Sequence, residues 1–114
     1  MRSYPSFVAG LNYPCPETGR SRLKYAGSHV KVGDRLTLVP EPDNEHDEDA
    51  VAYRHGGFHL GFVPSRHDWV ARSLAEGDTI VAEVTNVEIE RTGWLGLGRE
   101  VRSIHVRLTI TSDG

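Results

Sequence analysis

The sequence has little of the residue types that build covalent or metal-based cores. It contains a single cysteine, Cys15, among 114 residues, which excludes an internal disulfide and a zinc site made of several cysteines. Cys15 lies between Pro14 and Pro16, and nothing around it is typical of a catalytic thiol. We therefore interpret it as an incidental thiol in a reducing compartment.

Long apolar runs are also missing. No segment approaches the roughly 18 consecutive apolar residues of a membrane-spanning helix, and residues 1–5 lack the apolar stretch of a secretory signal. With 38% hydrophobic residues, the chain has the size of one compact domain over residues 1–114. These absences predict a single cytoplasmic domain with no membrane partner.

Charge of one sign is not in large excess. The formal net charge of -3 gives no general attraction to nucleic acid or to anionic lipid. The distribution is uneven, however, because residues 1–39 carry a net +4 and residues 40–50 a net -6. Nucleic-acid contacts would therefore need a local basic face. The alternative interpretation is that the basic residues of this segment are solvated charges on ordinary strand surfaces.

What the sequence does contain is a series of short alternating segments separated by glycine and proline, a pattern typical of strands. It predicts a mainly β fold: a small antiparallel β-barrel of about six strands, OB-like or SH3-like, with one or two short helices. Residues 14–30 are expected to form a long irregular connection that offers basic side chains to a phosphate backbone, namely Arg20, Arg22 and Lys24. The expected strands are residues 7–13, 35–39, 50–55, 58–63, 79–89 and 101–111.

Gly56-Gly57 is the clearest local signal, because both residues can adopt a positive φ between two segments of strand formers. It predicts a two-residue hairpin. One face of the hairpin collects Ala50, Ala52 and Gly61 with Arg54 and His59, and its small side chains would allow another backbone or a ligand to approach closely. The expected pairs are His55 with Phe58, Tyr53 with Leu60, and Val51 with Phe62.

One helix is expected over residues 66–76. Ser65 is its predicted N-cap, Asp68 its acidic capping partner, and Gly77 lies just beyond its end. The glycines of the following loop, residues 91–99, do not follow the GxGxxG order of a dinucleotide site, so we expect a hairpin connection there. The predicted inward stripe of the helix is Trp69, Val70, Ser73 and Leu74.

Catalytic and metal-binding patterns are weak. His55 and His59 would point to opposite faces of the predicted hairpin, and the acidic segment 43–54 lacks both the glycine and the final glutamate of a calcium loop. No segment carries a nucleophile elbow or a cysteine and histidine arrangement. We therefore predict no enzyme activity, no cofactor and no metal site.

Several motifs together resemble the HIRAN domain. They are the segments 7–13, 36–51 and 60–64, and the resemblance runs from about residue 6 to residue 90. The most specific part is Glu41-Pro42-x-Asn44-x-x-Asp47-x-x-Ala50-Val51, followed by Gly61-Phe62-Val63-Pro64.

This resemblance implies a small antiparallel β-barrel that captures the free 3′ end of single-stranded DNA. HIRAN domains occur fused to SWI/SNF-type helicases of replication-fork repair and as stand-alone, mostly bacterial proteins, and this chain is similar to the second kind. At the positions of the family pocket, Tyr13 would stack on the terminal bases and Asp47 would accept a hydrogen bond from the 3′-hydroxyl. A carboxylate there would repel a 3′-phosphate and so distinguish a free end.

The chain departs from the family pattern at two of these positions. Asn12 stands where DNA-binding members carry arginine, and His46 stands where they carry tyrosine. Both can still contact DNA, Asn12 by an uncharged hydrogen bond and His46 by stacking. The resemblance also assigns a DNA contact to Phe62, whereas the hairpin register assigns it to the core. Charge alone adds Arg66 as a phosphate contact, and Trp94 offers a further aromatic ring.

We therefore predict a non-enzymatic module that recognises single-stranded DNA at its 3′ end, in DNA repair or replication-fork processing. Three residues also have a purely structural interpretation: Asn44 and Asp47 as turn residues, and Tyr13 as a core aromatic. Two alternative functions remain open. One is a protein-interaction module whose acidic segment 41–49 docks a basic partner, and the other is an accessory of a separate helicase or nuclease.

Overall fold

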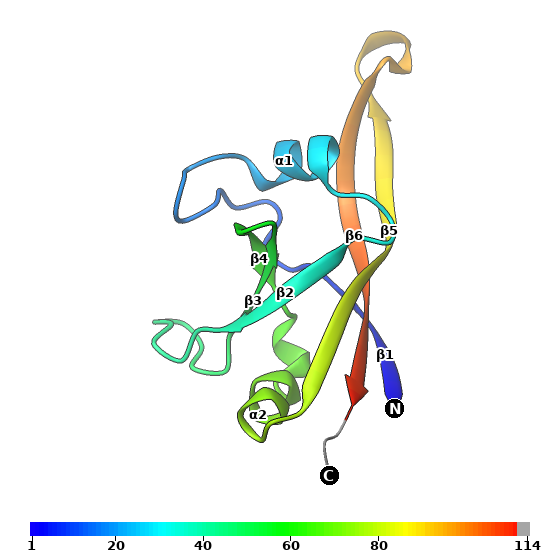
Figure 1. Cartoon of the computed structure of the whole chain (residues 1–114). Coiled ribbons are helices and arrows are strands. Elements are labelled where there is room, and N and C mark those ends of the chain that lie inside the picture. The colour runs from blue at the N-terminus through cyan, green and yellow to red at the C-terminus, as the bar shows by residue number, and fades with distance from the viewer. Residues whose placement is uncertain (112–114) are drawn as a thin grey trace.

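The computed structural model describes residues 1–111. Six strands alternate with two short α-helices and two 3-10 turns, as Figure 1 shows. The strands are β1 (Arg2–Phe7), β2 (Arg35–Pro40), β3 (Val51–His55), β4 (Phe58–Phe62), β5 (Thr79–Thr92) and β6 (Gly98–Thr111). The helices are α1 (Arg22–His29) and α2 (Trp69–Ala75), and the 3-10 turns are η1 (Ser65–His67) and η2 (Trp94–Gly96).

All six strands belong to one antiparallel sheet in the order β1-β6-β5-β2-β3-β4. The sheet curls into a half-barrel, so that the chain just after β1 meets β4 at the opposite end of the strand order through the bridge between Ala9 and Phe62. The predicted mainly β fold with two short helices is confirmed.

The core lies inside this curl and follows the alternation of the strands. On β6, Ile104, Val106 and Leu108 are buried while Arg107 between them is exposed, as the predicted alternation requires. Tyr53 of β3 is the largest fully buried side chain, and burial raises its pKa to about 12.

The β3–β4 hairpin confirms the predicted turn and corrects the register behind it. Gly56 and Gly57 have φ values of 55° and 89°, and His55 pairs with Phe58. A bulge between Tyr53 and Arg54 then shifts the register by one residue. Tyr53 therefore lies opposite Gly61 instead of Leu60, and Ala52 instead of Val51 lies opposite Phe62.

The predictions for residues 7–30 were wrong in two places. The first strand, β1, spans Arg2–Phe7 and shares only Phe7 with the expected strand 7–13, because Gly10 adopts a φ of 84° and turns the chain. Residues 22–29 of the expected irregular connection form α1, which begins where the Ser21 hydroxyl accepts a hydrogen bond from the backbone N–H of Lys24.

The predicted helix over 66–76 is shorter and starts differently. Ser65 does not cap it; residues 65–67 form η1 and α2 begins at Trp69, with no side-chain cap from Asp68. The reason is that the Pro64 carbonyl accepts a hydrogen bond from the His67 N–H, which tightens this turn into a 3-10 helix. The inward stripe and the terminal glycine are confirmed: Val70 and Ser73 are buried, Trp69 and Leu74 pack against the core, and Gly77 has a φ of 96°.

β5 and β6 form a long hairpin through residues 93–97, which confirms the hairpin connection predicted for this loop. In Figure 1 the yellow and orange end of this hairpin projects well beyond the rest of the sheet. No helix within residues 1–111 is long and apolar enough to span a bilayer.

One buried hydrogen-bond chain makes stability depend on pH. The Tyr53 hydroxyl donates to Ser6 Oγ over 3.3 Å, and Ser6 Oγ lies 3.1 Å from Nδ1 of His67, so the serine hydroxyl can donate to a neutral imidazole. Burial lowers the pKa of His67, and the neighbouring Arg66 charge adds to this effect.

Because the folded state disfavours the protonated imidazole, the unfolded chain binds more protons, and stability should rise with pH through the window just below the ordinary histidine pKa of about 6.5. Urea unfolding between about pH 5 and 7 is expected to show a smaller rise for His67→Gln than for the wild type. An unchanged pH dependence in that variant would contradict the assignment.

Candidate functional site

Tyr13 lies on a tight turn that follows β1. The Tyr13 N–H donates to the Gly10 carbonyl over 3.1 Å, and Leu11 between them is buried. Asn12 and Tyr13 point outward, with 71% of Tyr13 exposed. Tyr13 is therefore not a core aromatic, and its ring is available for stacking.

β4 holds the base of this turn by a close backbone crossing. Ala9 exchanges two backbone hydrogen bonds with Phe62, of 2.8 and 2.9 Å. Gly61 faces this crossing, and a Cβ atom there would collide with the Ala9 carbonyl oxygen and with a methyl group of Val8. The predicted close approach of another backbone at Gly61 is confirmed, and it fixes the turn against the sheet.

The acidic segment between β2 and β3 is ordered by its own side chains. Asn44 Oδ1 accepts hydrogen bonds from the N–H groups of His46 and Asp47, and Asp47 Oδ1 accepts one of 2.9 Å from the Asp49 N–H. Asn44 and Asp47 are thus turn residues. No hydrogen bond in the described residues uses Asp47 Oδ2, so the carboxylate retains an acceptor oxygen.

A buried polar chain connects these two segments. Arg22 is 3% exposed; its guanidinium donates to the carbonyls of Gly10, Tyr13 and His59 over 3.1, 3.5 and 3.1 Å, and to Nδ1 of His59 over 2.7 Å. On its other side, His59 Nε2 lies 2.8 Å from Glu41 Oε2. The remaining oxygen of Glu41 accepts a bond of 3.2 Å from the Asn44 amide.

The chemistry of the partners fixes the tautomer of His59. An arginine has no acceptor, so Nδ1 must accept from Arg22 and the ring hydrogen must sit on Nε2, where it donates to Glu41. Burial lowers the pKa of Arg22, although a guanidinium keeps its proton at any physiological pH. The Arg22–His59–Glu41–Asn44 chain, which we call the polar chain, therefore ties the turn carrying Tyr13 to the turn carrying Asp47.

Phe62 lies on the polar chain. Its ring is half-buried, with the Arg22 guanidinium 5.7 Å from the ring centroid and the His59 ring edge-on at 4.9 Å. The one-residue shift in the β3–β4 register explains why Phe62 is half-buried instead of lying in the core. The polar chain thus connects by hydrogen bonds to the Tyr13 carbonyl and to the backbone of His46 and Asp47, and it packs against Phe62, while Asn12 is exposed beside Tyr13.

The basic residues are more dispersed. Arg66 packs on the Phe7 ring at 5.2 Å, and Arg20 covers the stacked rings of Tyr25 and Phe58 at 5.7 and 5.8 Å. Both arginines remain exposed, as does Lys24 on α1. Arg22, in contrast, uses its guanidinium internally instead of presenting it to solvent.

Sequence reasoning missed the polar chain. Arg22 and His59 are 37 positions apart, and only the folded hairpin shows that one faces the other. His55 and His59 bond to different carboxylates, Asp34 and Glu41. Within residues 1–111 no three metal-ligating side chains come together.

Comparisons with known proteins agree with this fold. A family model described as the HIRAN domain matches residues 3–103. The crystal structure of the HIRAN domain of human HLTF is similar with a TM-score of 0.60 and 15% identity, over 93% of this chain and 74% of that one. A crystal structure of a protein from Lactobacillus plantarum is similar with a TM-score of 0.62 and 16% identity, over 94% and 96%. No curated protein matches the sequence.

Proposed function

Because the chain belongs to the HIRAN domain family, a family of DNA-binding modules, we propose that it binds single-stranded DNA by the free 3′-hydroxyl end. In this proposal the terminal bases stack on Tyr13, and Asp47 Oδ2 accepts the hydrogen bond of the 3′-hydroxyl. The module performs no chemistry itself and serves DNA repair or replication-fork processing.

The observation that carries the proposal is the link between an exposed aromatic ring and a carboxylate with a spare acceptor. The polar chain joins the backbone around Tyr13 to the turn that presents Asp47, so the backbone that carries both groups is held in place before a ligand arrives. A site arranged in advance loses less conformational entropy on binding.

The charge around Asp47 favours binding of a DNA end over binding of an internal stretch of single-stranded DNA. Asp43, Glu45, Glu48 and Asp49 are exposed on the same loop, and their carboxylates repel phosphates. A terminal hydroxyl carries no charge and approaches them at lower cost. Basic residues beyond the loop, Arg20, Lys24 and Arg66, supply the phosphate contacts, and His46 and Asn12 flank the terminal nucleotides.

Substitution of Tyr13 tests the stacking role. Tyr13→Ala is expected to weaken binding of a short single-stranded oligonucleotide about tenfold, since stacking on an aromatic side chain contributes about 1–3 kcal/mol per base. Tyr13→Phe keeps the ring and should bind like the wild type. Fluorescence anisotropy measures both, and equal affinity for the alanine and phenylalanine variants would contradict the role of the ring.

A second candidate function is favoured by the same acidic loop. Its exposed carboxylates at positions 43, 45, 48 and 49 form no ion pairs in the described residues, so they suit a basic protein partner, including a separate helicase or nuclease. Replacing Asp43 and Glu45 by Asn and Gln separates the functions. A docking role predicts loss of partner co-purification, whereas DNA end capture predicts unchanged or stronger DNA binding.

A further inference from the structure

The outer part of the β5–β6 hairpin, residues 85–103, stands apart from the sheet; we call it the arm. β5 pairs with β2 only at Ala82 and Glu83, and the pairing of β1 with β6 ends at His105, just before the arm. The two strands of the arm therefore pair only with each other, and α1 covers part of one face (Figure 1). A two-stranded ribbon alone is marginally stable in water.

The tip of the arm exposes a cluster of large apolar side chains. Trp94, Leu95 and Leu97 are 86%, 72% and 80% exposed. Leu95 has a φ of 68°, and no other non-glycine residue among those described has a positive φ. Large apolar groups gathered on a projecting loop are typical of an interaction surface.

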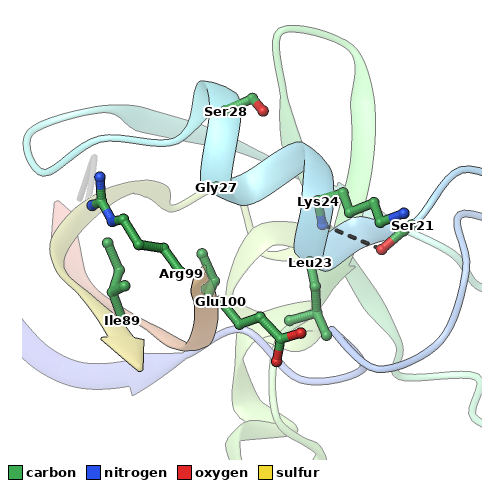
Figure 2. Close-up of a pocket in the computed structure, with 9 residues that line it drawn as sticks. Ser21, Leu23, Lys24, Gly27, Ser28, Ile89, Arg99 and Glu100 are labelled. Carbon is green, nitrogen blue, oxygen red and sulfur yellow. Dashed lines mark hydrogen bonds between the residues drawn. The ribbon is translucent and has the colours of Figure 1, made fainter. Parts of the chain in front are cut away.

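A groove that can receive this tip lies between α1 and residues 89 and 99–101 of the arm. Figure 2 shows the groove between α1 and the hairpin, with a volume of about 520 Å³. Val101 lies under α1 and is buried, whereas its cross-strand partner Ile89 lines the same groove and remains 43% exposed. The helix thus covers one strand of the arm and leaves apolar surface on the other.

The charges of the arm favour a second copy of the chain over a nucleic acid. The arm contains three acidic and three basic residues, so it has no net charge to attract phosphates. Arg91 lies directly opposite Arg99 and Glu90 directly opposite Glu100, an arrangement that is unfavourable within one hairpin. Arg102 offsets it for Glu90 through an ion pair of 2.6 Å, whereas Arg91, Arg99 and Glu100 form no ion pair within residues 1–111. A two-fold related arm can place these three residues beside charges of the opposite sign.

We propose that two copies associate through their arms, with the Trp94 tip of each copy in the α1–hairpin groove of the other. Trp94 is five residues beyond Ile89 along the chain, about 17 Å in an extended strand, so a two-fold axis midway between them brings tip and groove together reciprocally. Bulges at Val84/Asn86 and Glu88/Ile89 interrupt the edge of β5, so the contact is made by side chains.

The area involved fits a weak dimer. Burial of the three tip side chains of each copy, with the groove surface that they cover, removes on the order of 1,000 Å² in total. The proposal is independent of DNA end capture, because Tyr13 and Asp47 are not part of the arm.

Sedimentation equilibrium from about 10 μM to about 1 mM tests it. The wild type should rise from a mass of 12.7 kDa toward twice that value. Trp94→Ser at the tip and Ile89→Lys in the groove should each remain monomeric, with circular dichroism confirming that they fold. The matched control is Val32→Ser, which removes a 62% exposed side chain outside the arm and should dimerise like the wild type.

Two outcomes would overturn the proposal. One is a monomeric wild type at all concentrations, and the other is a dimer unaffected by both arm variants. In the first case, weaker binding of single-stranded DNA by Trp94→Ser would assign the tip to DNA. Loss of dimerisation in both arm variants, together with wild-type dimerisation of Val32→Ser, would support the proposal whatever the affinity of these variants for DNA.

Discussion

Asp47→Asn is expected to lower the affinity for a 3′-hydroxyl end about 10 to 100 fold and to leave unchanged or raise the affinity for a 3′-phosphate end. A hydrogen bond to a charged group contributes about 1.5–3 kcal/mol, which sets this range. Asparagine retains the Oδ1 acceptor that bonds the Asp49 N–H, so the turn survives. The substitution converts the spare Oδ2 acceptor into a donor and removes the charge that repels a terminal phosphate.

The matched control for this variant is Asp49→Asn. Asp49 is exposed on the same loop, so its substitution changes the local charge equally without touching the spare acceptor of Asp47. It should leave the affinity for the 3′-hydroxyl end undiminished and raise the affinity for the 3′-phosphate end only modestly, because it removes one repelling charge. Anisotropy titrations with the two end types give the ratio directly, and a ratio that stays at the wild-type value in Asp47→Asn would remove Asp47 from the site.

Arg22→Met is expected to lower the free energy of unfolding by about 3 kcal/mol or more, because breaking a buried polar pair leaves its partners unpaired. The carbonyls of Gly10 and Tyr13 and Nδ1 of His59 would lose their donor in the interior. Single-stranded DNA binding should fall as well, since the turn that carries Tyr13 would no longer be held. Urea unfolding and anisotropy measure the two effects.

Arg107→Met provides the control. Arg107 forms an exposed ion pair of 2.7 Å with Glu83, and such pairs contribute about 0–1 kcal/mol, so this variant should be close to wild type. If Arg22→Met does not fold, Glu41→Gln weakens the same polar chain more gently and should still reduce DNA binding. A folded Arg22→Met or Glu41→Gln variant with wild-type affinity would show that the polar chain does not position the site.

The strand pattern was predictable wherever a local rule decided it. Gly56-Gly57 specifies its hairpin because positive φ is required at both residues, and β6 alternates because one of its faces is buried. The register behind the hairpin was not predictable, because the bulge at Tyr53/Arg54 arises from packing that no local pattern encodes. Because of this one-residue shift in register, Phe62 is half-buried against the polar chain, whereas the predicted register had placed it in the core.

The site itself was predictable only in part. Family motifs predicted Tyr13 and Asp47 as site residues, and Asn44 proved to be the turn residue that its side chain favours. Arg22 was predicted as a phosphate contact because it stands with Arg20 and Lys24 in a segment that was expected to be an irregular basic loop. Its burial depends on α1 bringing it against His59, a contact between distant parts of the chain.

The most direct test of end capture compares three forms of one short single-stranded DNA by anisotropy: a free 3′-hydroxyl, a 3′-phosphate and a closed circle, each at about 50 and 200 mM salt. We expect tight binding of the 3′-hydroxyl form alone, and weaker binding at the higher salt because phosphate contacts contribute. Equal binding of the circle, or no binding of any form at the lower salt, would contradict end capture.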